Sequence, residues 1–178
     1  FVGRSGALLV NLGTLDAERR AALPLALDAA AQAGIPVVLD PVLVEASPPR
    51  LGLAREILRR RPSVARLNAS EFEALSGARP DVDRVREFAG GSRTVIALTG
   101  ATDLVANGRT VLTLGNGHPL MAQVIAMGCA AGALIAALLA CRGEPLLSAT
   151  TGLGALGVAG EIAGETARGP GTFAVSIL

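Results

Sequence analysis

Four short apolar runs, separated by helix-forming segments, constrain the fold of this chain more than any other feature. The runs span residues 7–10, 36–39, 63–67 and 94–98. Strands that are apolar on both faces are typical of a parallel sheet that helices cover on either side. The alternation of strands and helices therefore predicts an α/β fold with a mainly parallel central sheet and right-handed crossovers.

Helix-start and helix-stop residues mark the segments between these runs. Asp16 is expected to cap a helix that ends at Gly34, and Ser70 is expected to cap a short helix with Glu71 in its first turn. Asn107-Gly108 stands between two apolar runs and predicts a hairpin. The segments expected to be helical are residues 17–33, 51–61, 71–77, 82–88, 145–168 and a short stretch after 169–171.

The segment from residue 116 to residue 141 opens with turn residues and continues as an uncharged run rich in Ala, Gly and Leu. This pattern predicts a loop that leads into a buried helix whose first turn lies near Cys129. A helix start carries partial positive charge and suits a phosphate group. The alternatives are a core helix in which Cys129 is a small apolar residue, or a membrane span. The absence of Trp and Tyr argues against a span, so no membrane partner is expected.

Each of the four apolar runs ends in a polar residue, and these residues are Asn11, Asp40, Asn68 and Thr99. The carboxyl ends of parallel strands meet at one edge of a sheet, where ligands bind in open α/β folds. We therefore expect these side chains to form a site with the start of the helix near Cys129. The same residue types are common in turns, so an ordinary loop role is the alternative.

Composition narrows the functional classes. The 178 residues are expected to form a single domain, residues 1–178, and the net charge of +1 with scattered Arg predicts no nucleic-acid partner. The sequence contains no lysine, which excludes a P-loop and a Schiff-base lysine. The single His argues against a Ser-His-Asp triad or a structural zinc site. Two cysteines do not form a disulfide framework, which favours a cytoplasmic location.

A series of motifs in chain order resembles a known family. The motifs are NLGTL at 11–15, VVLDPV at 37–42, RLNASEFEALSG at 66–77, ALTGATDLVANG at 97–108, NGHPLM at 116–121, Gly128-Cys129, GVAGE at 157–161 and GPGTF at 169–173. Together they resemble the hydroxyethylthiazole kinase family, a thiamine-salvage family of the ribokinase-like superfamily. The resemblance implies a three-layer α/β sandwich and a homotrimer with the active site near a subunit boundary.

The resemblance also implies an enzyme that uses ATP and Mg²⁺ to phosphorylate the hydroxyl of 4-methyl-5-(2-hydroxyethyl)thiazole. By position, Arg66, Thr99 and Gly100 match residues that contact ATP, and Asp40, Asn68 and Glu71 match residues associated with Mg²⁺. Asn11, Gly13, Ala126 and Gly128 fall at positions assigned to the substrate. Cys129 falls at the catalytic position, beside the attacking hydroxyl as its base or orienter.

Several positions depart from the family pattern. Ile125 and Ala126 stand where the family has Thr and Gly, and Leu67 stands where it has Gly. Residues 43–47 replace a glycine-rich segment, and the family's N-terminal portion, with its thiazole-contacting methionine, is not expected within this sequence. These departures favour two alternatives to a thiazole kinase. One is a related kinase for another small alcohol, and the other is a non-catalytic homologue that binds ligand.

Individual site residues have structural alternatives too. Arg66 could belong to a surface ion pair, and Asn68 with Glu71 could form an ordinary helix start. His118 is expected to form structural hydrogen bonds rather than to act as a base.

Overall fold

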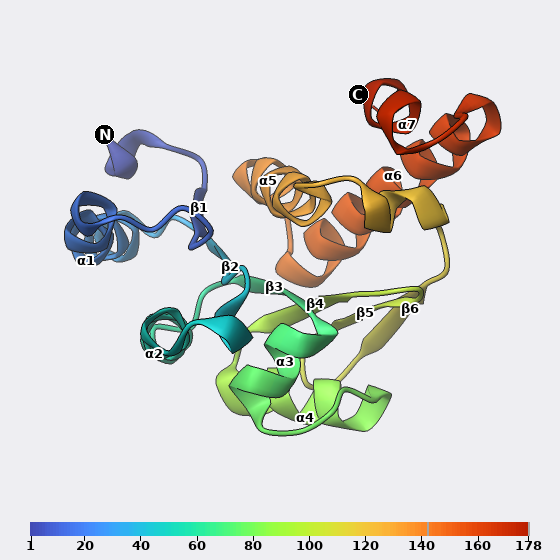
Figure 1. The fold of residues 1–178 in the computed structure, drawn as a ribbon. Coiled ribbons are helices and arrows are strands. Elements are labelled where there is room, and N and C mark those ends of the chain that lie inside the picture. The colour runs from blue at the N-terminus through green and yellow to red at the C-terminus, as the bar shows by residue number, and fades with distance from the viewer. Residues whose placement is uncertain (142, 178) are drawn as a thin grey trace.

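A six-stranded sheet runs through the molecule in the order β1-β2-β3-β4-β5-β6 (Figure 1). The computed structural model describes residues 1–141 and 143–177. The strands are β1 Leu8–Asn11, β2 Val37–Asp40, β3 Val64–Asn68, β4 Val95–Thr99, β5 Asp103–Ala106 and β6 Val111–Leu114. Strands β1 to β4 are parallel, and β5 and β6 each run antiparallel to the strand before. The predicted α/β fold with a mainly parallel sheet and the predicted hairpin are both confirmed.

The first helices cover one face of this sheet. They are α1 Ala17–Ala33, α2 Pro48–Arg59, α3 Ala69–Ser76 and α4 Val82–Ser92. Because β1 to β4 follow one another in sequence order, right-handed crossovers place all of these helices on the same side. The core on this face includes Leu39 and Ile96 of the sheet, and Phe72 packs edge-on against Phe88 with ring centroids 5.3 Å apart.

The opposite face is covered by α5 Met127–Ala140 and α6 Pro145–Thr166, and α7 Pro170–Ser176 follows α6 (Figure 1). This core is built from smaller side chains of the sheet, such as Val38 and Val64, together with Ile135 of α5 and Leu153 of α6. Short 3-10 helices lie at Val2–Arg4, Val44–Ala46 and Pro119–Gln123. The three-layer arrangement with helices on both faces is confirmed.

Strand alternation determines which face receives the polar strand ends. In β2, Val38 packs in the core under α5 and Leu39 in the opposite core, so Asp40 faces α5 again. The register pairs Asn11 with Asp40 and Asn68 with Thr99. The prediction that these four polar residues end their strands at the same edge of the sheet is confirmed.

Helix starts and ends differ in part from the expectations. The predicted caps at Asp16 and Gly34 are confirmed for α1. Ser70 is not the cap of α3, because Asn68 accepts from Glu71 N and the Glu71 carboxylate accepts from Asn68 N in a capping box. Helix α2 begins earlier than expected, at Pro48–Pro49, because the fixed φ of proline suits the first helical positions. Helix α4 continues to Ser92, beyond the predicted 82–88.

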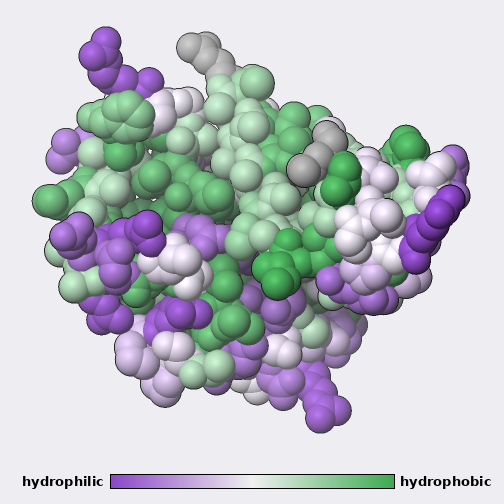
Figure 2. Space-filling model, turned by 45° about the horizontal axis from the view of Figure 1, so that its top comes forward, coloured by the Kyte–Doolittle hydropathy of each residue, from purple (hydrophilic) through white to green (hydrophobic). Residues whose placement is uncertain are grey.

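Apolar helices on the α5–α6 face bear on the question of a membrane span. Helix α5 has 14 residues, which is shorter than a bilayer requires. Among the described residues, α6 is the one helix long and apolar enough to cross a membrane by length and composition. Figure 2 shows apolar side chains on the surface of this side, but α6 also packs its buried residues against the sheet. A core helix accounts for this pattern.

Gly152→Ala tests the close contact between α5 and α6. A Cβ at this position would lie 2.9 Å from Ile135 Cγ1 and 3.4 Å from the Ile135 backbone nitrogen, so the Ile135 side chain or its helix must shift. The expected overpacking cost of about 1–3 kcal/mol should exceed the gain of about 1 kcal/mol that Ala has over Gly in a helix. Urea denaturation should therefore show a lower free energy of unfolding.

Gly52→Ala in α2 is the matched control, because no atom lies within 4 Å of the added Cβ. This variant should raise the free energy of unfolding. An equal increase in both variants would contradict the close contact at Gly152.

Candidate functional site

Arg66 of β3 lies at the centre of the polar edge. Its Nη2 donates to Thr99 Oγ1 at 2.7 Å, and its Nη1 lies 3.4 Å from Asp40 Oδ1 and 3.9 Å from Glu71 Oε2. The side chain is only 12% exposed, so Arg66 does not belong to a surface ion pair. Within the described part of the chain, its Nε is a buried nitrogen without a hydrogen-bond partner. The guanidinium therefore has one unsatisfied donor, which is itself buried.

Two buried carboxylates balance this charge. Burial raises the pKa of Asp40, and the Arg66 guanidinium together with hydrogen bonds from Asn11 and Cys129 partly offsets the rise. Burial also raises the pKa of Glu71, and the backbone N–H groups of Asn68 and Leu43 oppose it. Removing one partner of such a buried cluster leaves an uncompensated charge. The cluster is therefore stable only as a set.

Asn11 connects the buried carboxylate to Cys129. Its Nδ2 donates to Asp40 Oδ2 at 2.8 Å and to Cys129 Sγ at 3.2 Å. Its Oδ1 accepts from Gly13 N at 2.9 Å, which fixes the orientation of the amide. Residues from β1, β2 and the first turn of α5 thus meet at one point, and Cys129 is half-buried there.

The first turn of α5 lies against Arg66. A Cβ on Gly128 would overlap with the Arg66 guanidinium, so this position requires glycine. Unpaired N–H groups at a helix start and a guanidinium are both positive, and their close approach is favourable when an anion lies beside both of them. Gly128 and Arg66 together can therefore bind a phosphate group.

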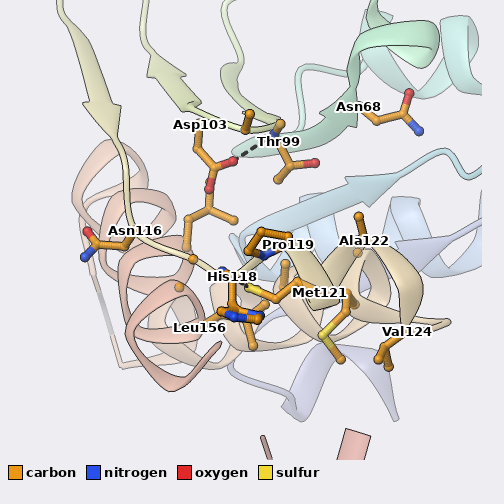
Figure 3. A pocket seen from close by; sticks show the side chains of 18 of the residues that line it. Asn68, Thr99, Asp103, Asn116, His118, Pro119, Met121, Ala122, Val124 and Leu156 are labelled. Atoms are coloured by element: carbon orange, nitrogen blue, oxygen red, sulfur yellow. Dashed lines mark hydrogen bonds between the residues drawn. The ribbon is translucent and has the colours of Figure 1, made fainter. Parts of the chain in front are cut away.

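A cleft of about 860 Å³ opens on the β4–β6 side of Arg66 (Figure 3). Its lining includes Thr99, Gly100 and Asp103 on the sheet side and Leu156 of α6 opposite. Segment 115–124 forms a further wall. Asn11, Asp40 and Cys129 do not line this cleft, so they lie on the other side of Arg66.

Glu161 of α6 holds the wall segment in place. Its carboxylate accepts from Gly117 N at 3.1 Å and from Asn116 Nδ2 at 3.2 Å. The His118 ring stacks on Phe173 of α7 with centroids 5.5 Å apart, and its Nδ1 accepts from Leu120 N. The expected structural hydrogen bond of His118 is confirmed.

Glycines of α6 make room for this segment. A Cβ on Gly157, Gly160 or Gly164 would collide with Asn116, Met121 or His118, in that order. The motifs GVAGE and GPGTF therefore shape the cleft wall. The sequence had given Glu161, Asn116 and Asp103 no individual role, and the motifs that contain them were the only signal.

Comparisons with known proteins show the family of the chain. The model of the hydroxyethylthiazole kinase family matches residues 1–178. The chain belongs to the hydroxyethylthiazole kinase family. A hydroxyethylthiazole kinase from Granulibacter bethesdensis is 41% identical over 191 aligned positions that cover all of this chain and 70% of that protein. A probable hydroxyethylthiazole kinase from Agrobacterium fabrum is 40% identical, covering all of this chain and 67% of that protein.

Solved structures agree with the family assignment. The structure of a hydroxyethylthiazole kinase protein from Pyrococcus horikoshii has a TM-score of 0.93 and 36% identity, over 99% of this chain and 70% of that one. A ribokinase-like superfamily protein from Enterococcus faecalis has a TM-score of 0.75 and 17% identity, over 98% of this chain and 61% of that one. This second likeness shows the ribokinase-like fold alone.

Two departures from the family's glycine pattern fall at left-handed backbone positions. Ala126, the N-terminal cap of α5, has φ 72°, and Leu43 has φ 55°. A left-handed conformation costs a residue with a Cβ about 1–2 kcal/mol. At Leu43 the strained turn is held by its N–H, which donates to Glu71 Oε1 at 3.0 Å. Ala126 makes no side-chain capping hydrogen bond, and its strained backbone lies directly before the first turn of α5.

The hydrogen bonds of Asp40 and Glu71 limit how these carboxylates could hold Mg²⁺. Within the described residues, no group of three or more His, Cys, Asp or Glu side chains could hold a metal by itself. Both Glu71 oxygens accept backbone N–H groups, and Asn68 Oδ1 accepts from Glu71 N. Mg²⁺ usually keeps several waters and takes one or two carboxylates plus phosphate oxygens. Asp40 and Glu71 both face Arg66 Nη1 and are 0% and 2% exposed, so an ion of this kind would reach them only through its waters.

Asp40→Asn tests the burial of this carboxylate through the pH dependence of stability. An acid whose pKa is higher in the folded state stabilises the fold below its ordinary value of 3.8, and this contribution is lost as the pH rises through the folded pKa. The asparagine of the variant does not titrate, so the free energy of unfolding of the variant has no such decrease. Its free energy of unfolding minus that of the parent should therefore increase as the pH rises from 3.8.

Urea denaturation without nucleotide or Mg²⁺ measures this difference. Losing the contact with Arg66 lowers stability at every pH. The test is therefore the slope of the difference in free energy of unfolding against pH, not its absolute value. Asp83→Asn, which makes the same change on the exposed surface of α4, is the matched control. A flat or falling difference for Asp40→Asn would contradict the cost of burying its charge.

Proposed function

We propose that this protein transfers the γ-phosphoryl group of ATP to the hydroxyl of 4-methyl-5-(2-hydroxyethyl)thiazole in a Mg²⁺-dependent reaction. Membership of the hydroxyethylthiazole kinase family supports this substrate. The observation that carries the proposal is the position of Arg66 between Thr99 and Asp40, directly under the first turn of α5. One positive centre thus separates a cleft for nucleotide from a cluster that contains Cys129.

Arg66 and the N–H groups of α5 would stabilise the transferring phosphoryl group. Phosphoryl transfer depends mainly on positioning and on stabilising charge at the phosphate oxygens. The guanidinium is already oriented by Thr99 Oγ1, and Arg66 lines the cleft in which the phosphates would lie. This arrangement provides fixed positive charge without any lysine.

Cys129 would lie beside the attacking hydroxyl, as its base or its orienter. Asn11 holds the sulfur in place and connects it to Asp40. Asn11, Gly13, Ala126 and Gly128 would surround the thiazole alcohol. When bound, Mg²⁺ would neutralise charge on the phosphate oxygens, and Asp40, Asn68 and Glu71 would hold it through its waters.

Release of ADP that depends on the thiazole alcohol tests the function, and Cys129→Ala tests the role of the sulfur in the same assay. A positioned base contributes roughly 10²–10⁴-fold in rate. We expect Cys129→Ala to lower kcat about tenfold or more, with little change in ATP affinity. Cys129→Ser should retain intermediate activity, because the hydroxyl keeps the geometry but is a weaker base.

Cys141→Ala is the matched control, because this second free cysteine is exposed at the end of α5. It should leave turnover unchanged. Equal turnover in Cys129→Ala and the parent, with only a lower melting temperature, would make Cys129 a core residue. Turnover with another small alcohol in place of the thiazole would contradict the substrate.

The protein would act as a homotrimer in the cytoplasm, with residues 1–178 as one domain. Exposed apolar residues on α6 and α7 support self-association, since Ile162 is 62% and Val175 76% exposed. The free thiols of Cys129 and Cys141 fit a reducing compartment. The shared sheet under both cores supports a single domain.

Light scattering tests the assembly. The parent should have the mass of three chains, and Ile162→Glu should shift the mass toward one chain because it buries a charge in the contact. Leu25→Glu makes the same kind of change on α1, where Leu25 is 72% exposed, and should leave the mass unchanged. A parent of single-chain mass at micromolar concentration would contradict the trimer.

A further inference from the structure

Asp103 is a carboxylate in the cleft that phosphoryl transfer itself does not use. It begins β5, is half-buried and lines the cleft (Figure 3). One oxygen, Oδ1, accepts from Gly100 N at 2.9 Å. Burial raises the pKa of this carboxyl, and the Gly100 N–H and the Arg66 guanidinium act in the opposite direction. The second oxygen is thus left for a ligand.

Strand order places Asp103 relative to the phosphate-binding centre. Val105 packs under α5 and α6 and Leu104 in the opposite core, so Asp103 faces the α6 side, as does Thr99. Along the polar edge the order is therefore Asp40 on β2, Arg66 on β3, Thr99 on β4 and Asp103 on β5. Adjacent strands lie about 4.8 Å apart, so β5 lies about 10 Å from β3.

Charge divides the cleft into two ends. Among the described residues that line it, Arg66 is the cation and Asp103 is the carboxylate. A phosphate group belongs at Arg66 and is repelled at Asp103. A carboxylate oxygen accepts hydrogen bonds from hydroxyl groups. The remaining lining is largely apolar, with Met121, Leu153 and Leu156, and suits a flat ring.

A nucleoside triphosphate has this sequence of groups: anions, a diol and an aromatic base. The acceptor alcohol belongs on the other side of Arg66, where Cys129 and Asn11 lie outside the cleft. The nucleoside must then extend from Arg66 past Thr99 toward Asp103.

We propose that Asp103 accepts hydrogen bonds from the ribose hydroxyl groups of the bound nucleotide, while the phosphates lie at Arg66 and Gly128. This inference rests on the proposed function only in taking ATP as the ligand of the cleft. It makes Asp103 a specificity residue that distinguishes a ribonucleotide from its deoxy analogues.

A purely structural role for Asp103 is the alternative, since Oδ1 already holds the turn at Gly100. Asp103→Asn separates the two roles. The amide keeps an oxygen for Gly100 N, while its NH₂ group replaces the second carboxylate oxygen with a donor. The turn is retained, and the acceptor for a ribose hydroxyl is lost.

Calorimetric binding of ATP and of 2′,3′-dideoxy-ATP, with Mg²⁺ and without any alcohol, tests the proposal. The parent should bind the dideoxy analogue about tenfold more weakly, which is the effect expected for a lost hydrogen bond to a charged group. In Asp103→Asn the ratio of the two affinities should fall toward one, because a remaining amide contact with the ribose is no longer assisted by charge. Asp83→Asn, on the exposed surface of α4, should keep the parent's ratio.

Comparing ATP with 2′,3′-dideoxy-ATP on the parent protein does not depend on the folding of any variant. The binding assay also needs no alcohol substrate. Discrimination in the parent that falls in Asp103→Asn supports the inference, whether or not the thiazole alcohol is phosphorylated. A parent that binds both nucleotides equally overturns it, even in an active thiazole kinase. An equal loss of affinity for both nucleotides in Asp103→Asn also overturns it and leaves Asp103 as a turn residue.

Discussion

The buried charge of Arg66 is the interaction on which the site depends. A guanidinium that is 12% exposed is stable only with partners, and Asp40 and Thr99 supply them from the strands on either side. The Gly128 position must then lack a side chain, because the guanidinium occupies the space that a Cβ would fill. The glycine and the carboxylate thus both accommodate one cation beneath a helix start.

The order of the strands places different groups on the two sides of Arg66. Cys129 and Asn11 lie toward β1, and the cleft with Asp103 lies toward β5. Such an arrangement suits a reaction in which two ligands approach one phosphoryl group from opposite sides. It also explains why α5 must begin where it does. Its first turn supplies Gly128 over Arg66 and Cys129 over Asn11 from adjacent positions.

Much of the edge could be predicted from the chain, because parallel strands leave their carboxyl ends on one side of a sheet. The positions of Asn11, Asp40, Asn68 and Thr99 followed from this rule. The cap of α3 was missed although its signal was present, since Asn68 and Glu71 have the spacing of a capping box. Hydrogen-bond geometry favours Asn68 over Ser70, because Asn68 Oδ1 accepts from the N–H of Glu71 three residues later.

By itself, the sequence determined the layers and the face on which the polar residues lie, because strand alternation and crossover handedness leave few other arrangements. Only the tertiary structure decided how Glu161 of α6 holds Asn116 and Gly117, and which side of Arg66 the cleft opens on. These contacts join segments far apart in the chain. Their geometry depends on how α6 packs over the sheet, and no local pattern of residues encodes that packing.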